Sequence, residues 1–311
     1  MEVPKTLQDA IVYFSDADRA FQYALNLRFP NGVVSCPRCG SEKHSFIKTR
    51  RVWFCSGCKK QFSLKVGTIF EDSPLGLDKW MCAYWILCNS KNGVSSCKIA
   101  RTLGITQKSA WFMLHRIRMT PLHDDSTVML SGEVEADETF IGGKARNMHT
   151  SVKARRITGT GTKDKIAVMG ILERGGQVRT TVVPNRKKTA LQAEVRKHVE
   201  AGAALYTDAL LSYNGVAGQY AHAIVDHAIE YVNGRVHTNG LENFWSLLKR
   251  GLSGTYVSIE PFHLFRYLDE QSFRYNHRKN MSDADRFEMA MSHVFGHRLT
   301  YSALTGAATA H

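Results

Sequence analysis

The sequence predicts an α/β catalytic core preceded by two small N-terminal modules, and three observations support this prediction. Two Cys-x-x-Cys pairs near the N-terminus mark a metal-binding segment. A helical stretch follows, and from about residue 130 the apolar pattern changes to short runs typical of strands, with helices after them. We therefore expect domains over residues 15–65, 75–120 and 128–280, then a C-terminal extension over 281–311 whose Ala/Thr/Gly-rich end is disordered.

The chain carries a large excess of positive charge. Its 311 residues include 41 Lys and Arg against 28 Asp and Glu, a formal net charge of +13. This excess predicts a polyanionic partner, because each neutralised phosphate releases condensed counterions; an inert basic surface is the alternative. No apolar run approaches the roughly 20 residues of a membrane span and the N-terminus is no signal peptide, so we expect a cytoplasmic protein without a membrane partner.

The paired cysteines predict one structural Zn²⁺. Fifteen residues separate the two pairs, which are Cys36 with Cys39 and Cys55 with Cys58. Each pair supplies two thiolates from a tight turn, and two pairs complete a tetrahedral zinc shell. Strand-like segments between and after the pairs fit a small β-ribbon, and disulfides are disfavoured in a reducing compartment. Because protein fills all four positions, the metal folds a segment too small to have its own core.

Residues 78–89 and 95–118 are predicted to be helical, and the second stretch has the pattern of a helix-turn-helix. Gly104 allows a sharp turn, and Thr106 is suited to cap the helix that follows. The exposed start of that helix is where recognition helices meet base edges, and it would present Gln107, Lys108 and Ser109. Arg116 is one of several basic residues that favour DNA binding over the alternative, an ordinary helical hairpin.

The segment after residue 128 predicts the catalytic core. We expect strands over 128–141, 165–172 and 177–183, a helix over 189–201, strands over 204–207 and 223–226, and helices over 241–250 and 261–276. Acids on the first strand, at the end of the fourth strand and on a late helix are the arrangement of a ribonuclease-H-like fold.

Those three acids are Asp137, Asp208 and Glu242. Carboxylates from two strands and a helix converge only through folding, and they suit hard cations such as Mg²⁺, which often act in pairs on phosphate esters. Each acid alone has a structural alternative as a turn cap or a helix-terminus charge. Strand alternation places Glu138 on the face opposite Asp137 and Glu135 on the same face, and neither is assigned to the site.

Together these features resemble bacterial insertion-sequence transposases of the zinc-ribbon DDE type, namely insertion-sequence family fifteen-ninety-five with its ISXO-type catalytic domain. With the zinc ribbon, the resemblance covers nearly all of residues 15–280. The other matching stretches are residues 135–144, 165–170, 206–208, 237–250, 266–270 and 274–278.

The resemblance implies a role for each matching residue. The catalytic metal ligands, holding two Mg²⁺ (or Mn²⁺) ions bridged by Asp137, would be Asp137, Asp208 and Glu242. Lys249, about two helical turns after Glu242, would contact a DNA phosphate. Some relatives have asparagine as the third ligand, so Asn239 is a rival, although it is neutral and better suited to cap the helix. His237 is expected at the edge of the site, on a phosphate or a metal-bound water.

Residues 144–165 hold seven Lys or Arg and one acid, Asp164, without apolar periodicity. We expect a flexible basic loop that becomes ordered on DNA, with Lys153, Arg155 and Arg156 among its contacts.

The implied function is DNA transposition. The enzyme would bind the terminal inverted repeats, cleave the ends, and join the freed 3′-hydroxyl to target DNA, acting at the bacterial nucleoid as a homodimer or higher oligomer. Two alternatives stay open. One is a catalytically inactive or domesticated DNA-binding protein, and the other is a ribonuclease-H-like nuclease that cuts without joining.

Overall fold

The computed structural model describes residues 4–120, 128–143, 149–156, 165–225 and 236–306. The chain forms two compact units. Unit 1 comprises Met1–His123 together with Lys279–His311, and unit 2 comprises Asp124–Arg278. The C-terminal extension therefore belongs to the same unit as the N-terminal modules. In the part of the chain that is described, no helix is long and apolar enough to span a membrane.

Unit 1 begins with two helices and a small β-ribbon. Helices α1 (Leu7–Phe14) and α2 (Ala17–Arg28) precede strands β1 (His44–Ile47), β2 (Val52–Cys55) and β3 (Gln61–Ser63), with a 3₁₀ turn, η1, over Lys48–Arg50. The strands pair antiparallel in the order β1-β2-β3. Trp53 and Phe62 are buried and stack with their ring centroids 5.5 Å apart, so this aromatic pair lies in the core of the ribbon.

The rest of unit 1 is helical. Its helices are α3 (Leu77–Asn89), α4 (Ser96–Leu103), α5 (Gln107–Ile117), α10 (Asp283–Ser292) and α11 (Tyr301–Thr305). The turn between α4 and α5 has the predicted form: Gly104 adopts a left-handed φ of 63°, and the Thr106 side chain accepts a hydrogen bond from the backbone N–H of Ser109 at 3.1 Å. The C-terminal end was expected to be disordered, but Leu304 of α11 is fully buried; residues 307–311 lie outside the described part.

Unit 2 is built on a five-stranded mixed sheet with the order β6-β5-β4-β7-β8. The strands are β4 (Glu133–Ile141), β5 (Ile166–Glu173), β6 (Val178–Val183), β7 (Ala204–Asp208) and β8 (Ala221–Val225). β5 pairs antiparallel with both β4 and β6, and the predicted turn at Glu-Arg-Gly-Gly joins β5 to β6. β7 runs parallel to β4 and β8.

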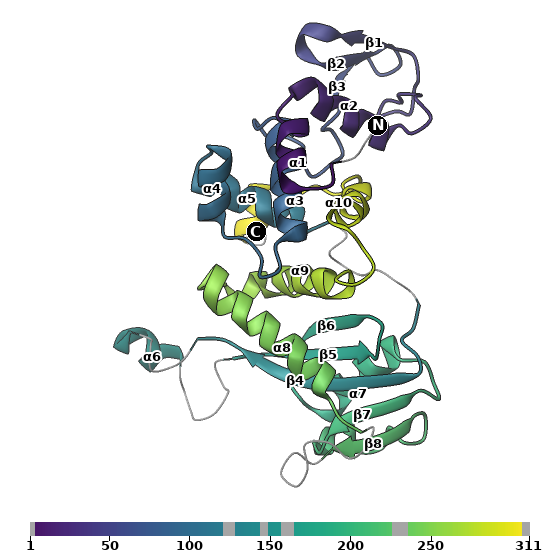
Figure 1. The fold of residues 1–311 in the computed structure, drawn as a ribbon, viewed down its shortest axis with the longest axis vertical. Helices are drawn as coiled ribbons and strands as arrows, with labels where there is room; N and C mark the ends of the chain where they lie inside the picture. The colour runs from purple at the N-terminus through teal and green to yellow at the C-terminus, as the bar shows by residue number, and fades with distance from the viewer. Residues whose placement is uncertain (1–3, 121–127, 144–148, 157–164, 226–235, 307–311) are drawn as a thin grey trace. The chain divides into compact units, whose positions relative to one another are not determined.

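Helices cover both faces of this sheet. On one face α7 (Lys188–His198) and the 3₁₀ turn η3 (Leu211–Tyr213) pack against a core that includes Val134, Ala136 and Leu191. On the other face α8 (Asn239–Gly251) and α9 (Leu264–Asn276) enclose a core that includes Val168 and Phe244. Figure 1 shows α8 running across β4 and β5. A π-helical turn, η4 (Leu252–Tyr256), and a 3₁₀ turn, η5 (Pro261–His263), join α8 to α9.

The basic segment over residues 144–165 is only partly described. It contains a short helix, α6 (Thr150–Arg156), where we expected a loop throughout. Lys153 on this helix is exposed, but the side chains of Arg155 and Arg156 lie outside the described part.

Candidate functional site

The four paired cysteines come together at one end of the ribbon. Their sulfur atoms all lie within 4.8 Å of one another, with Sγ–Sγ distances of 3.8 Å for Cys36–Cys58 and 3.6 Å for Cys39–Cys55. The Cys39 and Cys55 thiols share a hydrogen bond, which helps to lower the pKa of Cys55 to about 6, chiefly through the backbone N–H of Cys58, and to raise the pKa of Cys39 to about 11. A closed set of four thiols fits a structural Zn²⁺.

The topology of the sheet places the two aspartates side by side. Ala136 on β4 pairs with Thr207 on β7, so the next residue on each strand is Asp137 and Asp208 respectively. Both carboxylates therefore lie where β7 ends while β4 continues to Ile141. The third acid, Glu242, is exposed in the first turn of α8, the helix that covers this part of β4.

Electrostatics show that the three acids lie near one another. The pKa of Asp137 is raised to about 6: burial is the largest cause, hydrogen bonds from Glu138 and Trp245 oppose the rise, and the negative charges of Asp208 and Glu242 contribute to it. The charges of Asp208 and Glu242, which are 71 and 105 residues after Asp137 in the sequence, thus act on the Asp137 carboxyl in the fold.

The acids are close but do not form a closed ligand shell. Within the described residues, the four-cysteine cluster is the only group of three or more His, Cys, Asp or Glu ligands whose atoms lie within 4.8 Å. Like charges repel, so a dication is the kind of partner that would draw these carboxylates together. The donor set itself, three carboxylates of which Asp137 and Asp208 are half-buried, fits Mg²⁺ or Mn²⁺.

Two hydrogen bonds fix α8 to β4. The indole Nε1 of Trp245 donates to Asp137 Oδ2 at 2.9 Å, and the backbone N–H of Leu241 donates to Glu135 Oε2 at 3.0 Å. The donors are four residues apart on the helix, about 6 Å, and the acceptors are two residues apart on the strand, about 6.6 Å. This match of spacing sets α8, and with it Glu242, at a fixed register along the strand.

A glycine on β5 allows this close approach. Gly170 pairs with Asp137 across the sheet, and a Cβ atom placed on Gly170 would lie 2.6 Å from the ring of Trp245. Real Cβ atoms do not approach that closely, so any larger residue would push α8 away from the strand that carries Asp137.

Glu135, which the sequence did not assign to the site, lies within the candidate site. It is 1% exposed and accepts hydrogen bonds from Arg174 Nε at 2.8 Å as well as from Leu241. His237 lies 3.3 Å from the same carboxylate, and Arg174 also donates to the His237 carbonyl at 2.7 Å. Glu135 therefore anchors both the start of α8 and the segment before it. The sequence feature that could have assigned Glu135 to the site is strand alternation, which places its side chain on the same face of β4 as Asp137.

Asn239 does not cap α8, contrary to expectation. It is the first residue of the helix and is exposed, while the N-cap residue, Thr238, makes no side-chain capping bond. The Glu135 carboxylate, from a different element, takes the N–H of Leu241 instead. Lys249 is exposed near the C-terminal end of the same helix.

A fourth acid lies close to the aspartates. Glu138 accepts a hydrogen bond from the Tyr213 hydroxyl, and burial raises the pKa of its carboxyl to about 7, with Asp208 and Asp137 adding to the rise. It points away from the α8 face, as strand alternation predicted, but its charge still reaches the candidate site.

The residues of α5 that were expected to contact DNA divide into exposed and buried ones. Gln107 and Lys108 are exposed and Ser109 is half-buried, so the start of α5 is open as predicted. The expectation that Arg116 contacts DNA is wrong: it is 5% exposed and donates to the backbone carbonyls of Leu299 at 3.1 Å and Ile69 at 3.0 Å. Its guanidinium joins three segments of unit 1 and is not on the surface.

Two family models match the chain. Residues 129–276 match the ISXO2-like transposase domain, and residues 15–61 match the transposase zinc-ribbon domain. The chain is also 27% identical, over 256 residues, to a Halobacterium salinarum protein described as an uncharacterized protein in transposable element ISH50. That alignment covers 77% of this chain and 84% of its relative. The resemblance inferred from the motifs is thereby confirmed, and this chain is identified as an insertion-sequence transposase family member with a zinc ribbon followed by an ISXO2-like transposase domain.

Proposed function

We propose that unit 2 is a ribonuclease-H-like DDE catalytic domain that cleaves transposon ends and joins their 3′-hydroxyls to target DNA. The observation that carries this proposal is the arrangement of three acids: Asp137 and Asp208 follow paired residues on β4 and β7, and Glu242 lies on α8, whose Trp245 donates a hydrogen bond to Asp137. The basic net charge of +13 supports DNA as the substrate.

Asp137, Asp208 and Glu242 would hold two Mg²⁺ or Mn²⁺ ions. When bound, such ions supply an activated hydroxyl nucleophile and stabilise the attacking and leaving oxygens. The chain's own residues position these ligands: Trp245 fixes one oxygen of Asp137, and Glu135 fixes the start of the helix that carries Glu242. Lys249, exposed on the same helix, would hold a phosphate near the cut.

Unit 1 would hold the terminal inverted repeats. The exposed start of α5, with Gln107, Lys108 and Ser109, suits a recognition helix. The zinc ribbon would add a second contact, and Lys153, which is exposed on α6 within unit 2, would add a further one. Two ends must be joined, so we propose a homodimer or higher oligomer on DNA.

An assay with labelled ends separates this function from its alternatives. Duplexes copied from the DNA flanking the gene are incubated with the full chain, a target plasmid and Mg²⁺, and cleaved and joined products are resolved on a denaturing gel. A transposase gives both products, a nuclease gives cleavage alone, and an inactive DNA-binding protein shifts the duplex without cutting it. The last two results would each refute the proposal.

A further inference from the structure

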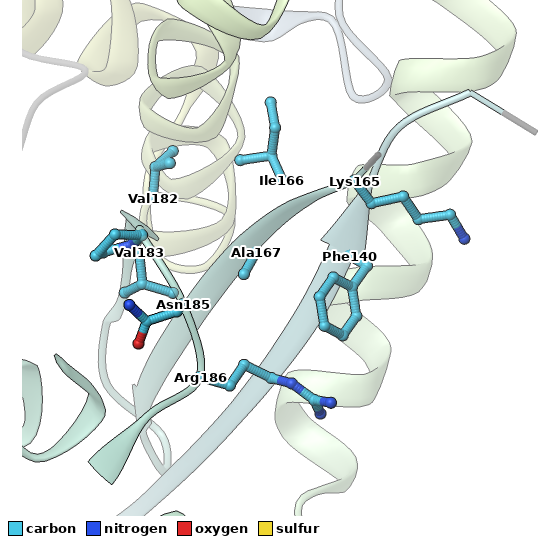
Figure 2. Close-up of a pocket in the computed structure, with 9 residues that line it drawn as sticks. Phe140, Lys165, Ile166, Ala167, Val182, Val183, Asn185 and Arg186 are labelled. Atoms are coloured by element: carbon cyan, nitrogen blue, oxygen red, sulfur yellow. The ribbon is translucent and has the colours of Figure 1, made fainter. Parts of the chain in front are cut away.

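A cavity of about 510 Å³ opens at one end of the sheet in unit 2, beside the edge strand β6. Its wall includes Phe140 from β4, Lys165 before β5, and the segment after β6 with Pro184, Asn185 and Arg186. Ala167 and Val183 line the apolar part (Figure 2). The volume lies within the range of about 300–1,000 Å³ that is usual for small-ligand sites.

The lining combines three kinds of group. Lys165 and Arg186 are cations, and none of the nine lining residues is acidic. Among the described residues neither cation forms an ion pair. The Arg186 guanidinium lies 4.7 Å from the centroid of the Phe140 ring. Together the planar cation and the ring form a flat, positively charged surface beside apolar residues. Cations, a planar stacking surface and an apolar wall are the groups that bind a phosphate and a base together.

The cavity lies on the same strand as the first catalytic acid. Phe140 is three residues after Asp137 on β4, which is about 10 Å along the strand. That distance corresponds to about three nucleotides at the 3.4 Å rise of duplex DNA. Strand alternation places the Phe140 side chain on the α7 face of the sheet, opposite the face on which Asp137 meets α8. β4 ends at Ile141, one residue after Phe140, so a DNA strand with its reactive phosphate at Asp137 would reach the cavity around this end of the strand.

We propose that this cavity is a nucleotide subsite, which takes one base and its phosphate from the DNA strand a few positions away from the reacting bond. This inference rests on the proposed function, because it assumes that the strand being cut lies at Asp137. Arg186 and Lys165 would hold the phosphate, and the Arg186–Phe140 pair would stack against the base.

The test is a double-mutant cycle between protein and DNA. End duplexes carry a single abasic site at each position near the cut, and single-turnover nicking in Mg²⁺ is measured with wild-type protein and with Phe140→Leu, which keeps an apolar side chain and removes the ring. We expect one position at which loss of the base slows wild-type nicking by about fivefold or more, because stacking on an aromatic side chain contributes about 1–3 kcal/mol. At that position Phe140→Leu should slow nicking no further.

Charge is tested with matched variants. Arg186→Ala should weaken binding of the intact duplex and reduce its salt dependence, measured by fluorescence anisotropy without Mg²⁺. Lys187→Ala removes the same charge from the next residue, which is exposed and does not line the cavity, and should leave the abasic-site profile unchanged.

Two failures can be told apart. If wild-type protein does not nick the intact end, the proposed function fails. If it nicks, but Phe140→Leu lowers the rate equally at every abasic position, or Lys187→Ala has the same effect as Arg186→Ala, the cavity is not a nucleotide subsite.

Discussion

The zinc ribbon of unit 1 and the carboxylate site of unit 2 are both candidate metal sites, but they differ in how far the chain has assembled them. In the ribbon, four sulfur atoms already lie within 4.8 Å of one another. In unit 2, the three acids influence one another but form no group that compact among the described residues. The cysteines are supplied by two local turns on paired strands, whereas the acids come from three elements and repel each other.

The metal has a different role at each of the two sites. In the ribbon the metal completes a closed shell and stabilises a small fold. In unit 2 the fold is held by its own two cores, and the metal would complete a reactive site. Removing a ligand should therefore affect folding in unit 1 and chemistry in unit 2.

The largest effect is expected for Asp137→Asn. Loss of the charged ligand shared by the cations should lower nicking and joining by about 10³-fold or more, a cost of about 4 kcal/mol. Binding of end DNA, measured by gel shift, should stay nearly intact. A variant that still nicks at about a tenth of the wild-type rate would remove Asp137 from the site.

Cys36→Ser, in contrast to Asp137→Asn, should impair zinc binding and the folding of the ribbon rather than the chemistry of unit 2. Zinc measured by atomic absorption should fall from about one ion per chain to near zero, and hydrogen exchange should increase over β1 to β3 while unit 2 keeps its protection. Specific end binding should weaken. Cys97→Ser, at an exposed cysteine outside the cluster, is the control. Normal end binding in a zinc-free Cys36→Ser protein would leave the cysteines without a metal role.

The third ligand is tested by a pair of variants on α8. Glu242→Gln should eliminate Mg²⁺-dependent cleavage, because a neutral amide replaces a charged ligand of a dication. Asn239→Ala should lower cleavage only modestly, since Asn239 is exposed and does not cap the helix. An active Glu242→Gln enzyme together with an inactive Asn239→Ala enzyme would make asparagine the third ligand.

A smaller effect is expected from the residues that position α8. Trp245→Phe keeps most of the ring but removes the N–H donor to Asp137, and Gly170→Ala forces the ring away from the strand. Each should lower the cleavage rate by about 10–100-fold and raise the Mg²⁺ concentration needed for half-maximal rate. Gly218→Ala, where an added Cβ meets nothing within 4 Å, is the matched control. A rate loss without any change in Mg²⁺ dependence would make these residues purely structural.

Much of this organisation could be predicted from sequence, because it depends on local spacing. Two Cys-x-x-Cys pairs predicted the cysteine cluster, and the change to short apolar runs after about residue 130 predicted the sheet that carries Asp137. The burial of Arg116 could not be predicted, because its partners, Leu299 and Ile69, are distant in the sequence. The same holds for Glu135, whose bond to the start of α8 spans 106 residues.

The stability of unit 2 is expected to depend on pH, because two of its carboxyl groups have raised pKa values. Burial holds the pKa of Asp137 at about 6 and that of Glu138 at about 7, above the ordinary carboxyl range. The folded, metal-free unit therefore binds protons that the unfolded chain has already released. Its stability is greatest below about pH 4 to 4.5 as far as these two groups contribute, and falls as pH rises through about 6 to 7. Bound Mg²⁺ would offset this loss.

Hydrogen exchange of the zinc-loaded full chain, with and without millimolar Mg²⁺, tests the central claim most directly. After correction for intrinsic exchange, metal-free peptides from β4 and α8 should lose protection between pH 5 and pH 7.5. Mg²⁺ should restore it at pH 7.5 in wild type but not in Asp137→Asn, and should leave the zinc ribbon unchanged. If Mg²⁺ protects neither β4 nor α8, or protects them equally in Asp137→Asn, the carboxylates do not form the metal site.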